Sequence, residues 1–255
     1  MVSLLEAIIL SIVQGITEWF PISSSGHLVL AQELLGNVEY QTFGFTIYLH
    51  FASVLSVVIL FGKDIAKLTV LNKKNLSYLI KLAIAIIPAG VVGILLLEQV
   101  RNAFSNFLFL GIFFMIMGIF IYSTKYARER KNTLTNSDAV YIGVSQVFAL
   151  FPGVSRSGMT MGSGLILGLK REEAIKFSFL LAIPIIIGAT IVEAKEISLA
   201  SIPFTILLTS FTITLLISLI TIKFLVKTIM NNKFYLFGIY NFILGVLVVL
   251  WYVLR

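Results

Sequence analysis

Three ionisable side chains stand in two short polar segments of an otherwise apolar chain. Glu18 and His27 belong to the first segment, and Arg156 belongs to the second. A charged side chain at the centre of a bilayer costs about 2.5–3.5 kcal/mol on insertion scales, so such residues are retained there mainly when they are paired or functional. A carboxylate, an imidazole and a guanidinium that converge would suit the binding and hydrolysis of an anionic phosphate ester.

Hydroxyl side chains surround these three residues. Arg156 would offer a bidentate fork to phosphate oxygens, and serine hydroxyls would donate further hydrogen bonds. Serines at these positions also fit N-caps of the following helices, whose free N–H groups and positive dipole ends attract anions. His27 has the chemistry of an acid, a base or a nucleophile, and Glu18 that of an orienting group, a proton acceptor or a ligand for a divalent cation. The hydroxyl candidates for substrate binding are Ser23, Ser24, Ser25, Ser155, Ser157 and Thr160.

Simpler explanations exist for some of these residues. An intramembrane Arg–Glu pair can serve structure alone, but the neighbouring histidine and serines argue against that reading. A second histidine, His50, lies in the middle of an apolar run. For His50 we favour a packing role over a role in the site. Glu6 and Glu33 fall near the expected membrane interfaces and are not assigned to the site.

The two polar segments share one layout. They run from Gln14 to Gly26 and from Gln146 to Gly158, which is twelve positions in each case. Each has an aromatic–proline pair in the middle and a serine cluster near its end, and each is flanked by apolar stretches too short to span a bilayer. This pattern predicts two re-entrant helix pairs.

The composition predicts an all-α integral membrane protein. The 255 residues are 58% hydrophobic and only 12% charged, whereas soluble domains carry roughly a quarter charged residues. The absence of cysteine excludes disulfides and cysteine nucleophiles. Six apolar runs are near or within the roughly 17–25 residues that cross a bilayer, namely Thr42–Phe61, Leu79–Leu97, Phe104–Tyr122, Phe177–Val192, Ile202–Ile222 and Phe234–Leu254.

The order of these segments predicts an inverted repeat. Each polar segment is followed by three apolar runs, so the single membrane domain, residues 1–255, divides into halves of about 1–125 and 135–255. Three spans per half place the start of the second half on the opposite side of the membrane. The expected fold is therefore six transmembrane helices plus two re-entrant helix pairs, whose tips meet near the midplane.

The distribution of basic residues predicts the orientation in the cell membrane. The formal charge of +7 does not indicate nucleic-acid binding, because the basic residues lie between apolar runs, where the positive-inside rule explains them. On this basis both termini face outward. The residues assigned to the cytoplasmic side are Lys63, Lys67, Lys73, Lys74, Lys125, Arg128, Arg130, Lys131, Lys170, Arg171, Lys176, Lys223, Lys227 and Lys233; Arg101, Lys195 and Arg255 remain outside.

The polar segments also resemble a known family. The stretches Glu18–His27 and Pro152–Gly158 are similar to the two signature motifs of the undecaprenyl-diphosphate phosphatase family, also called the bacitracin-resistance family. Further family-like stretches are Ile87–Gly93 and Phe177–Pro184. The resemblance implies a multi-pass enzyme that hydrolyses undecaprenyl diphosphate to the monophosphate, the lipid carrier for surface glycans. It also implies a divalent cation, Mg²⁺ or Ca²⁺.

The resemblance implies roles for individual residues. Glu18 and His27 match the catalytic acidic and histidine residues, and Ser24 matches a proposed nucleophile. The phosphate-binding signature corresponds to Ser155, Arg156 and Ser157, with Thr160 beside it. One position departs from the family pattern: Gln14 stands where a second glutamate is usual. Because a neutral amide binds a cation more weakly, Gln14 is kept as a substrate-binding candidate and Glu18 alone as the metal candidate.

Several alternatives remain open from the sequence. Either Ser24 or His27 takes the phosphoryl group. Broken helices in an inverted repeat are also transporter architecture, so a polyprenyl-phosphate transporter or flippase is the rival function. The expected partners are the prenyl diphosphate substrate and membrane lipids, and a homodimer is left open together with the metal, the prenyl chain length and the leaflet served.

Overall fold

The computed structural model describes residues 3–36, 43–70, 72–103, 106–193 and 202–255. Within these residues the regular structure is helical, apart from an isolated bridge between Lys131 and Leu169. The helices are α1 (Leu4–Thr17), α2 (Ser24–Leu34), α3 (Phe43–Leu60), α4 (Gly62–Leu68), α5 (Lys73–Leu95), α6 (Leu97–Ala103), α7 (Phe107–Ser123), α8 (Asn136–Val147), α9 (Arg156–Ile166), α10 (Arg171–Glu193), α11 (Phe204–Met230) and α12 (Leu236–Leu254), with 3-10 turns η2 (Thr124–Tyr126) and η3 (Phe148–Leu150).

The long helices confirm a multi-pass membrane protein. Five of the described helices are long and apolar enough to cross a membrane: α5, α7 with its η2 extension, α10, α11 and α12. The sixth expected span, over α3, is followed by α4 after a bend of 77°, and the pair counts as one further candidate. Residue 42 and residues 104–105, where two of the expected runs begin, lie outside the described residues, as does Lys195.

Several spans extend beyond the apolar runs that predicted them. Helix α5 begins at Lys73 rather than at Leu79, because the side chain of Asn72 caps it by accepting a hydrogen bond from the N–H of Asn75 (2.9 Å). Helix α11 continues past Ile222 to Met230. Hydropathy marks only the part of a helix that suits lipid, whereas the backbone hydrogen bonds continue through the polar turns on either side.

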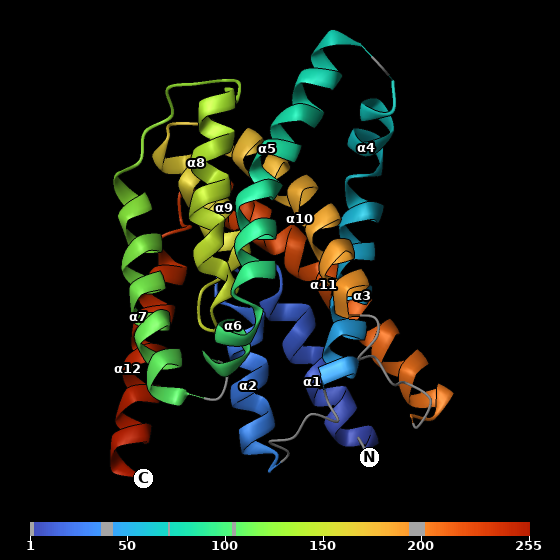
Figure 1. Ribbon diagram of the computed structural model, residues 1–255, viewed down its shortest axis with the longest axis vertical. Helices are drawn as coiled ribbons and strands as arrows, with labels where there is room; N and C mark the ends of the chain where they lie inside the picture. The colour runs from blue at the N-terminus through green and yellow to red at the C-terminus, as the bar shows by residue number, and fades with distance from the viewer. Residues whose placement is uncertain (1–2, 37–42, 71, 104–105, 194–201) are drawn as a thin grey trace.

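Two hairpins of short helices enter the molecule from opposite ends (Figure 1). Helices α1 and α2 enter from the end that holds both termini, and α8 and α9 enter from the other end. These helices have 14, 11, 12 and 11 residues, which is fewer than a membrane span requires. Helix α1 packs against α11, and α8 packs against α5.

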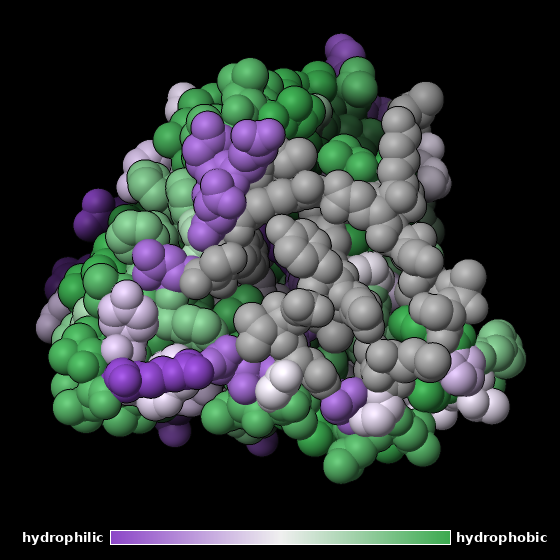
Figure 2. All heavy atoms as spheres, turned by 60° about the horizontal axis from the view of Figure 1, so that its bottom comes forward, coloured by the Kyte–Doolittle hydropathy of each residue, from purple (hydrophilic) through white to green (hydrophobic). Residues whose placement is uncertain are grey.

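Helix α9 of the second hairpin lies in the centre of the helix bundle, whereas α8 keeps an exposed apolar face with Val140, Tyr141 and Val144. Every residue of α9 from Ser157 to Leu165 is buried, because α7, α8 and α10 pack around it. Large hydrophobic side chains are exposed on most of the described helices, and on the face shown in Figure 2 the hydrophilic side chains form separate patches among them. This distribution is the one expected when the surrounding solvent is lipid.

Helices α7 and α12 approach each other closely. A Cβ atom added at Gly238 would lie 2.5 Å from the backbone nitrogen of Tyr122, and one added at Gly118 would lie 2.6 Å from that of Phe242. Small residues at such crossings let two backbones come into van der Waals contact, which is how helices associate in membranes. The pair thereby forms one wall beside the hairpin tips.

Candidate active site

The tips of the two hairpins bind each other directly. The N–H of Gly153 donates to the hydroxyl of Ser23 (3.1 Å). From the second tip, the hydroxyls of Ser155 and Ser157 donate to the carbonyl of Phe20 in the first (3.5 and 3.2 Å). Residues about 130 positions apart in the chain therefore form a single polar junction.

The first tip contains an unusual backbone conformation at Ser23. Its φ is +68°, a region that residues other than glycine adopt at a cost of order 1–3 kcal/mol and mainly at functional sites. The Ser23 hydroxyl also accepts a hydrogen bond from the N–H of Gly26 (3.3 Å), which caps α2. The strained residue thus fixes both the start of α2 and the contact with the second tip.

Glu18 is the centre of the polar cluster. It follows the last residue of α1 and is 5% exposed. Its Oε1 pairs with Nη2 of Arg156, the first residue of α9. Its Oε2 accepts hydrogen bonds from the hydroxyl of Ser24 (2.6 Å) and from Nε2 of Gln14 (3.0 Å). The structure therefore brings together the acid, the arginine and the serine that the sequence singled out.

Arg156 has one half of its guanidinium unpaired. The guanidinium lies over the buried Trp19 ring, 5.7 Å from the ring centre. While Nη2 pairs with Glu18, Nη1 is buried and has no hydrogen-bond partner. A buried donor without an acceptor costs roughly 1–3 kcal/mol, and more when it is charged, so Nη1 marks a place where an anionic oxygen would bind favourably.

His50, for which the sequence favours a packing role, also contacts this cluster. Its Nε2 lies 3.4 Å from Oε2 of Glu18, and its Nδ1 donates to the carbonyl of Thr46 (2.8 Å). The signal was the helical spacing of Thr46, His50 and Ser53 within α3, which places polar groups on one face of an apolar helix. Ser53 accepts a hydrogen bond from Gln14 (3.4 Å).

His27 lies beside a different partner. Its Nδ1 donates to the carbonyl of Ser23 (2.8 Å), and its Nε2 is 2.7 Å from the hydroxyl of Tyr240 in α12. The two rings stack with their centres 5.7 Å apart. The sequence left open that Glu18 orients His27. In the structure, Ser23 and Tyr240 orient His27 instead. Sequence reasoning missed Tyr240; the one signal near it in this apolar helix is the adjacent polar residue Asn241, which is buried.

The remaining hydroxyl candidates make contacts within the protein. The Ser25 hydroxyl is 3.3 Å from that of Ser23. The Ser155 hydroxyl caps α9 by accepting a hydrogen bond from the N–H of Gly158 (3.2 Å). Thr160 is buried, and its hydroxyl donates to the carbonyl of Arg156 (2.9 Å) and lies 2.5 Å from the Ser178 hydroxyl. These contacts hold the start of α9, so Thr160 supports Arg156 rather than facing the cluster.

The starts of two helices face the junction. Helix α2 begins at Ser24 and α9 begins at Arg156, and these residues are joined through Glu18. Each helix N-terminus carries unpaired N–H groups and about half a positive charge. Two such ends at one place favour an anionic group.

The side chains that could hold a metal ion are few. In the part of the chain that the structure describes, no cluster of three or more histidine, aspartate or glutamate side chains could hold one. Both oxygens of Glu18 are engaged. The oxygen of the Gln14 amide is buried without a partner, so it is a free acceptor next to that carboxylate.

Comparison with known proteins gives one consistent result. The model of the family described as bacitracin resistance protein BacA matches residues 7–247. A protein of Christiangramia forsetii named undecaprenyl-diphosphatase is 34% identical over 250 residues, covering 94% of this chain and 95% of its own. A protein of Shouchella clausii named undecaprenyl-diphosphatase 1 is 36% identical, with coverage of 96% and 95%. A protein of Methanosphaera stadtmanae named undecaprenyl-diphosphatase is 35% identical, with 98% of each chain covered.

Proposed function

Because this chain belongs to the bacitracin resistance protein BacA family, we propose that it is a membrane phosphatase that hydrolyses undecaprenyl diphosphate to the monophosphate and inorganic phosphate. The observation that carries the proposal is the unpaired Nη1 of Arg156 beside the Glu18–Ser24 hydrogen bond. A site for a phosphoryl group and an activated hydroxyl are then adjacent. The relatives are named diphosphatases, which favours hydrolysis over transport.

The proposed topology is an inverted repeat of halves 1–125 and 135–255. The two hairpins enter from opposite ends (Figure 1), which supports this topology. Each hairpin also packs on a helix of the other half: α1 packs on α11, and α8 packs on α5. In this arrangement the hairpins are re-entrant, α3 is the sixth span, and both termini face outward. The diphosphate reaches the junction at the tips while the prenyl tail stays in lipid.

The proposed reaction begins with the hydroxyl of Ser24. Glu18 Oε2 takes the hydroxyl proton across the 2.6 Å hydrogen bond as Ser24 Oγ forms a bond to the terminal phosphorus. The bond from this phosphorus to the bridging oxygen breaks, and the lipid monophosphate leaves with that oxygen. Water then hydrolyses the phosphoserine and releases inorganic phosphate. Ser24 is favoured over His27 as the nucleophile, because both nitrogens of His27 already face hydrogen-bond partners.

Arg156 and the helix ends stabilise the charge that develops. The guanidinium bridges the base and the substrate, since Nη2 holds Glu18 and Nη1 is free for a phosphoryl oxygen. The N-termini of α2 and α9 add positive potential from fixed backbone dipoles. Such preorganised groups are often the largest contribution to catalysis.

We also propose a divalent cation, Mg²⁺ or Ca²⁺, as part of the working enzyme. Gln14, whose amide oxygen has no partner, and Glu18 would hold a hard cation if Glu18 gave up one of its present hydrogen bonds, and diphosphate oxygens would supply further ligands. When bound, the cation would neutralise charge on the diphosphate. Because this chain supplies a single carboxylate to the cluster, the diphosphate has to contribute a large share of the ligands.

Phosphate release tests the proposed function. Purified protein in detergent, without a membrane gradient, should release one phosphate from each undecaprenyl diphosphate and none from undecaprenyl monophosphate. The same assay with and without chelator tests the cation, and a series of shorter prenyl diphosphates tests the chain length. Absence of release from every diphosphate, with transport of the lipid in vesicles, would contradict hydrolysis and favour the flippase.

His50 is proposed to pass the proton onward from Glu18. Since Nδ1 donates to the Thr46 carbonyl, Nε2 is left to exchange a proton with Oε2 of Glu18 at 3.4 Å. We expect His50→Gln to lower kcat roughly tenfold to a hundredfold, with little change in KM. Tyr48→Phe is the matched control, because it removes a hydrogen bond from the same helix to the Leu207 carbonyl (3.1 Å) away from the cluster. Equal kcat values for the two variants would contradict a role for His50.

A further inference from the structure

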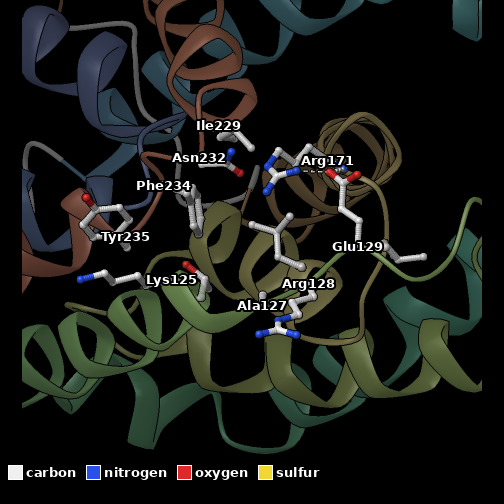
Figure 3. Close-up of a pocket in the computed structure, with 12 residues that line it drawn as sticks. Lys125, Ala127, Arg128, Glu129, Arg171, Ile229, Asn232, Phe234 and Tyr235 are labelled. Carbon is white, nitrogen blue, oxygen red and sulfur yellow. Dashed lines mark hydrogen bonds and ion pairs between the residues drawn. The ribbon is translucent and has the colours of Figure 1, made fainter.

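A basic cavity lies at the end of the molecule opposite the termini. It has a volume of about 510 Å³, part of it open to solvent, and it is formed where α7, α9 and α11 end and α10 and α12 begin (Figure 3). Leu165 lines it, nine residues along α9 from Arg156. At 1.5 Å per residue the cavity is about 14 Å from the catalytic cluster along that helix, so it is a separate place.

The charges that line the cavity do not cancel. Arg171 is paired with Glu129, but Lys125 and Arg128 make no ion pair with any described residue. Lys125 lies over two aromatic rings, 5.5 Å from the centre of Tyr122 and 5.3 Å from that of Tyr235. Figure 3 shows Lys125 beside Tyr235 on one side of the cavity and the Arg171–Glu129 pair on the other.

An apolar groove adjoins this cavity. It has a volume of about 530 Å³, part of it open to the surroundings, and it lies on the surface over the crossing of α7 and α12, where Gly118 and Gly238 bring the two backbones into contact. Tyr122 lines the groove, and Lys125, which lines the cavity, lies over the Tyr122 ring, so the groove and the basic cavity lie next to each other. Every residue that lines the groove is a glycine, an isoleucine or an aromatic residue.

We propose that the cavity and the groove together hold one anionic phospholipid. The headgroup phosphate binds Lys125 and Arg128, and an acyl chain lies in the groove between α7 and α12. Basic pockets between membrane helices bind anionic headgroups in this way, and tyrosines at helix ends mark the level of the headgroups. An amphipathic molecule suits both places at once, because its anionic headgroup matches the basic cavity and its acyl chain matches the apolar groove, whereas a free phosphate would occupy the cavity alone.

Native mass spectrometry of the purified full-length protein can test this. The protein is offered phosphatidylglycerol and phosphatidylcholine with the same acyl chains, and inorganic phosphate is added separately to compete with bound lipid. We expect the protein to retain phosphatidylglycerol preferentially, and the double variant Lys125→Gln/Arg128→Gln to lose this preference by roughly tenfold. Inorganic phosphate should not displace the lipid.

A matched control separates a specific site from general surface charge. Lys73→Gln/Lys74→Gln removes the same charge from exposed positions at the start of α5 and should leave the preference unchanged. Ile239→Trp, which fills the groove without changing charge, should also weaken retention of phosphatidylglycerol. Equal loss in both double variants would overturn the proposal, as would an unchanged preference in the cavity variant or displacement by inorganic phosphate alone.

Discussion

Arg156→Ala should reduce phosphate release from undecaprenyl diphosphate by about 10²–10³-fold in kcat/KM. The substitution removes the proposed ligand of the phosphoryl group and leaves the buried Glu18 carboxylate without its guanidinium partner. Arg156→Lys should recover little of the activity. The guanidinium has separate nitrogens for Glu18 and for a phosphoryl oxygen, whereas lysine has one ammonium nitrogen for both. The measurement is steady-state phosphate release in detergent.

The control for Arg156 has to show that the fold survives. Arg255→Ala removes another arginine–glutamate pair, with Glu33, at an exposed position, and it should retain nearly the full rate. Thermal unfolding of each variant reports the structural effect separately. If Arg156→Ala kept more than half of the wild-type kcat/KM, the proposed phosphate site would be wrong.

Ser24→Ala should lower kcat by at least roughly 10³-fold. The alanine removes the attacking oxygen and leaves Oε2 of Glu18 with the Gln14 and His50 contacts. Rapid quenching of the wild type with labelled substrate should yield an acid-stable phosphoserine, which mass spectrometry locates to residue 24. An acid-labile phosphohistidine at residue 27 would instead assign the nucleophile to His27.

Ser25→Ala is the matched control for the nucleophile. Its hydroxyl lies 3.3 Å from the Ser23 hydroxyl, so the change should affect the tip only slightly. His27→Ala should slow turnover yet still permit labelling of Ser24. Normal turnover by Ser24→Ala would reject the serine mechanism, whatever the effect of Ser25→Ala.

The sequence predicted the polar cluster around Glu18 at the points where polar residues interrupt an apolar background. Glu18 and Arg156 are far apart in the chain. Both were identified because a charged side chain in an apolar run is costly unless it is paired or functional. The structure pairs the two. His50 and Tyr240 were missed because the few polar side chains of α3 and α12 are outnumbered by apolar ones, so both helices were interpreted by their average hydropathy alone. Averaged hydropathy describes how a helix suits lipid, but it does not reveal which face of that helix turns toward a polar junction.

The bend after α3 was not predicted from the sequence either. The apolar run ended at Phe61 as expected, but the chain continues as the short helix α4 at an angle of 77°. Asp64 in α4 forms an ion pair with Lys176 in α10 (3.0 Å). This contact joins α4 to a helix more than a hundred positions away in the chain, so no local sequence pattern indicates it.

The mutual hydrogen bonding of the two tips has a consequence for how the protein is made. The first hairpin is synthesised early, but Gly153 and Ser155, which bind its tip, and α11, against which α1 packs, emerge much later. During translation the early segment therefore has to wait in or near the lipid with its polar turn unsatisfied. A ribosome that stops before α11 would release a chain with this turn exposed, which makes such fragments natural targets for membrane quality control.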